Sequence, residues 1–201
     1  QGVPHRVLGT RFFDRKEVKD VLSYIRAALN PESRQDIARI IGTPPRGIGK
    51  GTLVRMLEQT TQSLAPGVQK KVTAFYGLLE HIQSYATTHK PSETVRYVLE
   101  TSGLAALYAK GTEEDIERLG NMRELASLAT KYDTHEPREG IEQLLEDAAL
   151  LGEQDSLDKE VPAVSLMTVH AAKGLEFNVV FVTGMEEGLF PMERTGEHED
   201  T

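Results

Sequence analysis

Residues 164–191 read VSLMTVHAAKGLEFNVVFVTGMEEGLFP, and this stretch decides how the chain is organised. It begins with Val164, Leu166 and Val169, and an unbroken apolar run follows at residues 179–182. Runs of β-branched and aromatic residues are typical of buried strands. We therefore expect a piece of an α/β domain here, with two strands that flank a polar segment.

The polar segment between the two runs, residues 168–177, is a candidate ligand site. A polar cluster at the end of a buried parallel strand lies where α/β sheets bind their ligands. Lys173 beside Gly174 is suited to a phosphate, and Glu176 could accept hydrogen bonds from a sugar hydroxyl. On these residues alone, a strand-to-helix turn with exposed polar side chains explains the segment equally well.

The chain before this stretch has apolar residues at helical spacing instead. Asp14 followed by Glu17 is the pattern of a capping box. Ser92 and Thr112 are further candidate N-caps, and Gly103 is a candidate helix-ending glycine. The positions that we expect in helical cores are Val18, Val21, Leu22, Ile25, Leu29, Ile37, Ile40, Ile41, Leu53, Met56, Leu57, Val68, Val72, Phe75, Tyr76, Leu79, Ile82, Tyr85, Val95, Val98, Leu99, Ile116, Leu119, Leu125, Leu128, Ile141, Leu144, Leu145, Ala148 and Leu151.

These patterns divide the chain into four parts. They are a short strand in residues 1–11, a helical domain in 12–152, an acidic linker in 153–162 and the strand–turn–strand segment in 163–201. Strand-like pieces at both ends of a helical domain indicate a mainly α fold. In this fold, a helical domain is inserted in an α/β domain of which only short strands are present.

The charge is unevenly placed along the 201 residues, whose net charge is −8. Residues 1–60 hold 11 Lys/Arg and 6 Asp/Glu, so residues 61–201 hold 12 and 25. The basic part could provide a DNA-contacting face, although charged helical faces also vary without any ligand. The chain has no Cys and no apolar run that could span a membrane, which fits a cytoplasmic protein.

Residues 42–49, GTPPRGIG, cannot be helical, because two prolines and three glycines fall in eight positions. Gly47 and Gly49 let the backbone approach a phosphate closely, and the N–H groups of a following helix favour an anion. Arg46 and Lys50 add positive charge beside them. A connecting turn that binds nothing is the alternative.

A Walker A phosphate loop is excluded at this place. Its pattern requires glycine where Pro44 stands and a hydroxyl residue where Gly51 stands. The six histidines have no spacing typical of a metal site, and His81 and His89 are expected to face solvent. We therefore expect neither catalytic residues nor a metal site within these residues.

Three segments resemble superfamily 1A DNA helicases of the UvrD/PcrA/Rep family. Residues 164–191 resemble motif V, in which a strand leads into a T-x-H-x-x-K-G-L-E-F turn. Residues 12–26, FFDRKEVKDVLSYIR, resemble motif IVa, and residues 43–49, TPPRGIG, resemble the family's TPxRGIG element. The middle of the chain, about residues 60–150, matches only as generic helices.

The resemblance implies that the helical domain is domain 2B, inserted in the RecA-like domain 2A. It implies that Thr168 and His170 contact single-stranded DNA and that Glu176 binds ATP, with Lys173 and Gly174 in the turn between the two sites. The loop would correspond to a hairpin that grips duplex DNA. The residues implied in that contact are Thr43, Arg46, Gly47, Ile48, Gly49 and Lys50.

The resemblance thus implies a fragment of an ATP-dependent 3′→5′ DNA helicase, inactive alone and beginning at Gln1 without a Met. The parent would use ATP and Mg²⁺, while the fragment binds no cofactor. DNA, as single strand and duplex junction, is the expected partner, and the acidic helices are a candidate surface for proteins. A protein-interaction or autoinhibitory module and a subunit of a helicase–nuclease stay open as alternatives.

Overall fold

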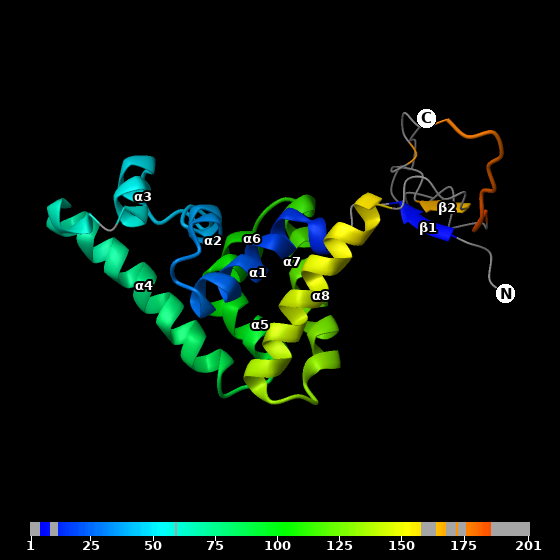
Figure 1. The fold of residues 1–201 in the computed structure, drawn as a ribbon. Helices are drawn as coiled ribbons and strands as arrows, with labels where there is room; N and C mark the ends of the chain where they lie inside the picture. The colour runs from blue at the N-terminus through cyan, green and yellow to red at the C-terminus, as the bar shows by residue number, and fades with distance from the viewer. Residues whose placement is uncertain are drawn as a thin grey trace, which may run out of the picture. The chain divides into compact units, whose positions relative to one another are not determined.

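The computed structural model describes residues 5–8, 12–58, 60–157, 164–167, 172 and 176–185. The chain falls into two compact units. The strand unit comprises residues 1–9 and 164–201, and the helical unit comprises residues 10–163. Helices make up most of the described residues, so the fold is mainly α, as predicted (Figure 1).

The strand unit contains two short parallel strands, β1 (His5–Leu8) and β2 (Val164–Met167). His5 pairs with Val164 and Leu8 with Met167, without a break in register. Parallel neighbours cannot be joined by a tight turn and need a long connection. Here the whole helical unit provides it, because the chain leaves the sheet after β1 and returns to it at β2.

The predicted second strand at residues 179–182 is wrong for this structure. The backbone there is neither helix nor strand. The side chains are exposed, to 70% at Val179 and 86% at Phe181. A strand needs a neighbour to satisfy its backbone groups, and in the described part of the sheet β1 and β2 pair only with each other.

The helical unit is built from eight α-helices and three short 3-10 helices within its described residues. They are η1 (Phe12–Asp14), α1 (Lys16–Leu29), α2 (Arg34–Ile40), α3 (Lys50–Leu57), η2 (Thr61–Ser63), α4 (Pro66–Ala86), α5 (Pro91–Thr101), α6 (Leu104–Tyr108), α7 (Glu113–Leu128), η3 (Ala129–Tyr132) and α8 (Pro137–Leu157). Within the described ranges, no helix has the length and apolar character to cross a bilayer.

Helix α1 forms the centre of the core. In Figure 1 it runs through the middle of the helical unit, and it packs against α2, α4, α5 and α7. Val18, Val21 and Ile25 on α1 are fully buried, as their helical spacing predicts. Burying each such side chain stabilises the fold by about 1.5–3 kcal/mol.

Two other predicted core positions are wrong: Ile116 is 60% and Leu128 44% exposed.

The predicted capping box at Asp14 is also wrong. The N-cap of α1 is Arg15, and Asp14 lies in η1, where its carboxylate is 2.6 Å from Lys19 Nζ. Glu17 is buried and accepts a hydrogen bond of 2.6 Å from Asn121 Nδ2 on α7. The Glu17 carboxylate therefore binds a side chain of another helix and not the backbone N–H group that the capping-box pattern predicts.

Ser92 is not an N-cap either, because α5 begins at Pro91 with Lys90 as its N-cap. The N–H and hydroxyl of Ser92 instead donate to the Asp133 carboxylate, at 3.0 and 2.7 Å. That carboxylate comes from the segment that follows η3, and it satisfies a leading N–H group of α5. The start of α5 is therefore tied to a distant part of the chain.

Two other predicted helix boundaries are confirmed. Thr112 caps α7 in a reciprocal arrangement with Asp115. Gly103 follows α5 with a φ of 85°, a left-handed conformation that favours glycine. Helix α8 continues to Leu157, so residues 153–157 of the predicted linker are helical, and residues 158–162 lie outside the described residues.

Candidate nucleic-acid interface

The loop that joins α2 to α3 holds the residues predicted to contact duplex DNA. We divide it into an inner half, residues 43–46, and an outer half, residues 47–50. The two halves have different surroundings. Thr43, Pro44 and Arg46 of the inner half are partly buried, whereas Gly47, Gly49 and Lys50 of the outer half are exposed.

Tyr24 on α1 holds the start of the inner half. Its side chain is fully buried, and its hydroxyl donates to the backbone oxygen of Thr43 at 2.6 Å. Burial raises the pKa of Tyr24 to about 12, although the nearby Arg46 guanidinium opposes that rise. The hydroxyl is therefore protonated at neutral pH and stays a donor.

Arg46 fixes the other end of the inner half. Its guanidinium donates to the backbone oxygens of Pro44 at 2.9 Å, Ser102 at 2.8 Å and, more weakly, Ile40 at 3.4 Å. It also lies 5.6 Å from the ring centre of Tyr24 and 5.7 Å from that of Phe75. The side chain thus connects the loop to α1, α4 and α5.

Two of these acceptors lie at helix ends. Ile40 is the last residue of α2 and Ser102 is the C-cap of α5. Terminal carbonyl groups of a helix lack intrahelical partners and carry the negative end of the helix dipole, so they favour a cation. Arg46 therefore caps two helices at once. The structure gives it a positioning role and leaves its predicted contact with DNA without direct support.

The outer half leads into α3 with its backbone open to solvent. Gly49 is the N-cap, and its carbonyl accepts from the N–H groups of Thr52 and Leu53, both at 3.0 Å. The first N–H groups of a helix have no intrahelical acceptor, and here Gly51 presents them without a shielding side chain. Lys50 is exposed at the same helix start. Such an arrangement attracts an anion.

Lys71 on α4 adds a second exposed cation to the outer half. Its Nζ lies 3.4 Å from the Gly47 backbone oxygen, and a Cβ on Gly47 would lie 2.6 Å from that Nζ. Sequence reasoning missed Lys71. Helical spacing does not indicate which loop an exposed lysine will meet.

The whole length of the chain is similar to one family of known proteins. A profile of the UvrD-like helicase C-terminal domain matches residues 1–201. The chain belongs to this family. It is 36% identical over 219 residues to the ATP-dependent DNA helicase PcrA of Staphylococcus epidermidis RP62A, which covers 98% of the chain and 30% of that relative. The same protein of Staphylococcus aureus Mu50 is 36% identical over 213 residues, covering 96% of the chain and 29% of the relative. The chain therefore spans about 30% of the length of these relatives.

The other residues that the family resemblance singles out belong to the strand unit. Glu176 is exposed in this structure. Thr168, His170, Lys173 and Gly174 lie outside the described residues, so their roles in ATP and single-strand binding stay predictions. Over the part of the chain that is described, no group of acidic and histidine side chains gathers in a way that could hold a metal ion.

Proposed function

We propose that the chain is part of an ATP-dependent 3′→5′ DNA helicase, and that its helical unit contacts duplex DNA through the outer half of the loop. The family supports the first statement, together with relatives that are named ATP-dependent DNA helicases. The observation that carries the second is the pair of exposed lysines, Lys50 and Lys71, beside the open helix start at Gly49.

The proposed contact is with phosphates. Lysine side chains and helix N–H groups bind phosphate oxygens, and such contacts fix the position of a protein on a duplex without reading its sequence. This suits a protein that must engage any duplex ahead of a moving fork. The inner half would hold the loop in the conformation that presents Lys50 and the N–H groups of α3.

The strand unit would contribute to the nucleotide and single-strand sites of the longer protein. Thr168 and His170 would contact the single strand, and Glu176 would accept a hydrogen bond from the ATP ribose. Lys173 and Gly174 would form the turn between them. ATP with Mg²⁺ would supply the phosphoryl-transfer chemistry, and we expect the chain alone to be inactive because it carries no Walker A pattern.

Binding of a duplex–single-strand junction tests the proposed contact. We expect Lys50→Ala and Lys71→Ala each to weaken binding about tenfold at low salt, because each removes a charge-assisted hydrogen bond. Lys110→Ala removes an exposed lysine elsewhere and is the matched control. Unchanged affinity in the Lys50→Ala, Lys71→Ala double variant would contradict the proposal.

A second candidate function is contact with a protein partner through α7. Ile116 is 60% exposed, and it lies among acidic residues that include Glu113 and Glu117. This surface is too acidic to attract DNA, but an exposed apolar residue with an acidic surround can bind a protein. If junction DNA binds neither the unaltered chain nor the variants, this function is favoured over DNA contact.

A further inference from the structure

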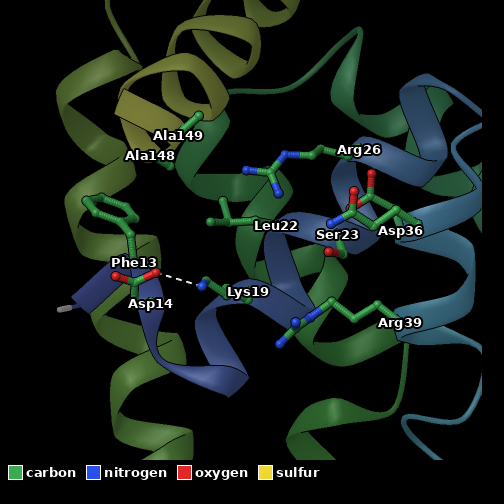
Figure 2. A pocket seen from close by; sticks show the side chains of 11 residues that line it. Phe13, Asp14, Lys19, Leu22, Ser23, Arg26, Asp36, Arg39, Ala148 and Ala149 are labelled. Atoms are coloured by element: carbon green, nitrogen blue, oxygen red, sulfur yellow. Dashed lines mark ion pairs between the residues drawn. The ribbon is translucent and has the colours of Figure 1, made fainter. Parts of the chain in front are cut away.

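A pocket of about 400 Å³ opens between α1, α2 and α8, and it contains no residue of the loop (Figure 2). Its volume is in the range of pockets that bind small ligands or short peptide segments. One part of the wall is apolar, from Phe13, Leu22 and Ala148, and the other part is polar. The pocket is therefore suited to a ligand with both an apolar and a charged group.

Two of the three cations in the wall are already paired. Lys19 Nζ lies 2.6 Å from the Asp14 carboxylate. Arg39 Nε lies 2.7 Å from Oδ1 of the buried Asp20, and Arg39 also donates to a backbone oxygen of α1. The charge of each of these two cations is therefore already balanced by a carboxylate of the fold.

Arg26 is the third cation, and its guanidinium has no hydrogen bond or ion pair among the described residues. Figure 2 shows it pointing across the pocket from α1 toward Ala149 on α8. A guanidinium presents paired N–H donors that match the two oxygens of a carboxylate. Arg26 thus offers an unused binding group for a planar anion.

Ser23, three residues before Arg26 on α1, is the second unused group. Only 2% of this residue is exposed, yet it lines the pocket and its hydroxyl has no hydrogen bond with any described residue. Its Oγ is not one of the fully buried polar atoms that lack a partner, so it opens into the pocket, where solvent or a ligand can accept its hydrogen bond. An acceptor on a ligand in the pocket would satisfy it.

We propose that this pocket binds an acidic peptide segment of a protein partner, with a carboxylate on Arg26 and Ser23. An adjacent aliphatic side chain packs on Leu22 and Phe13. A nucleic acid fits less well, because a row of phosphates needs several available cations, and among the described cations of the wall Arg26 alone has no carboxylate partner. The inference does not depend on the DNA-contacting loop.

Nuclear magnetic resonance of the ¹⁵N-labelled chain tests this with three probes: acetyl-Ile-Glu-Leu-amide, its glutamine counterpart acetyl-Ile-Gln-Leu-amide, and inorganic phosphate. We expect the glutamate peptide to bind about tenfold more tightly than the glutamine peptide, with shifts centred on Ser23 and Arg26. Arg26→Gln should abolish that difference, while Arg123→Gln, an exposed arginine on α7, should keep it.

Three results would overturn the inference. They are an absence of binding, equal affinity for the two peptides, and phosphate binding as tight as that of the glutamate peptide. Thermal melting checks that Arg26→Gln still folds. If it does not, Ser23→Ala replaces it, with about a threefold loss of affinity for the glutamate peptide and none for the glutamine peptide. A Ser23→Ala chain that binds both peptides as the unaltered chain does would also contradict the proposal.

Discussion

The two halves of the loop carry one cation each, four residues apart, and the two side chains have different surroundings. Arg46 in the inner half points into the protein and binds three backbone oxygens. Lys50 in the outer half is exposed beside the open start of α3. Charge and position in the sequence are therefore insufficient to assign a contact with DNA. The supply of acceptors within the fold decides whether a cation is available to a ligand.

The largest expected effect is on the free energy of unfolding, when the inner half loses the Arg46 side chain. Arg46→Ala removes side-chain donors from two helix ends and leaves the part-buried backbone oxygens of Pro44 and Ser102 without the guanidinium, although the Ile40 oxygen keeps the N–H group of Thr43. We expect a loss of about 2–4 kcal/mol in the free energy of unfolding, measured by urea denaturation. The control is Arg55→Ala, which removes an exposed arginine of α3 and should change stability by less than about 0.5 kcal/mol. An Arg46→Ala chain as stable as the control would contradict the positioning role.

The next effect concerns the point where the two halves meet. Gly47 has a φ of 64°, so Gly47→Ala would place a Cβ in a conformation that costs about 1–2 kcal/mol. Gly49 is the matched control, because its φ is −82° and nothing lies within 4 Å of a Cβ built there. We expect thermal melting to show a larger destabilisation for Gly47→Ala than for Gly49→Ala, which loses only the preference of an N-cap for glycine over alanine. Equal melting temperatures for the two variants would mean that the turn does not require glycine at position 47.

A smaller effect is expected at Arg39, a second arginine held by the fold. Arg46 binds backbone oxygens, whereas Arg39 is paired with the carboxylate of Asp20. Burial raises the pKa of Asp20 above its ordinary 3.8, and the opposing effect of Arg39 is smaller. A raised folded-state pKa means that the folded state binds the proton more tightly, so stability is lost as pH rises through that pKa. Urea denaturation between about pH 4 and pH 7 should show this loss in the unaltered chain and not in Asp20→Asn. If the free energy of unfolding depends on pH in the same way in the unaltered chain and in Asp20→Asn, the raised pKa of Asp20 is contradicted.

Local patterns in the sequence predicted much of the helical unit. Helical spacing identified the buried face of α1, and the turn chemistry of Gly103 and Thr112 is local, so it could be read directly. The glycines and prolines of the loop likewise marked a break between helices. These features depend on residues within a few positions of one another, and that is why they were predictable.

Several contacts that the local pattern did not indicate depend on distant partners. Glu17 bonds Asn121, 104 residues away, in place of the predicted local cap. Arg46 bonds Ser102, 56 residues away, and Lys71 reaches the loop from 24 residues away. No spacing rule indicates such contacts, because packing of the helices decides which groups meet. For the same reason, the task of each cation in the candidate site could not be assigned before the fold was known.

The salt dependence of duplex affinity tests the division of the loop most directly. Each lysine–phosphate contact contributes about 0.9 to the slope of log affinity against log salt concentration. We predict that Lys50→Ala reduces the magnitude of that slope by about one. Arg46→Gln, measured at a temperature where it is folded, should lower affinity without changing the slope. A slope that falls by about one for Arg46→Gln and stays constant for Lys50→Ala would contradict the account.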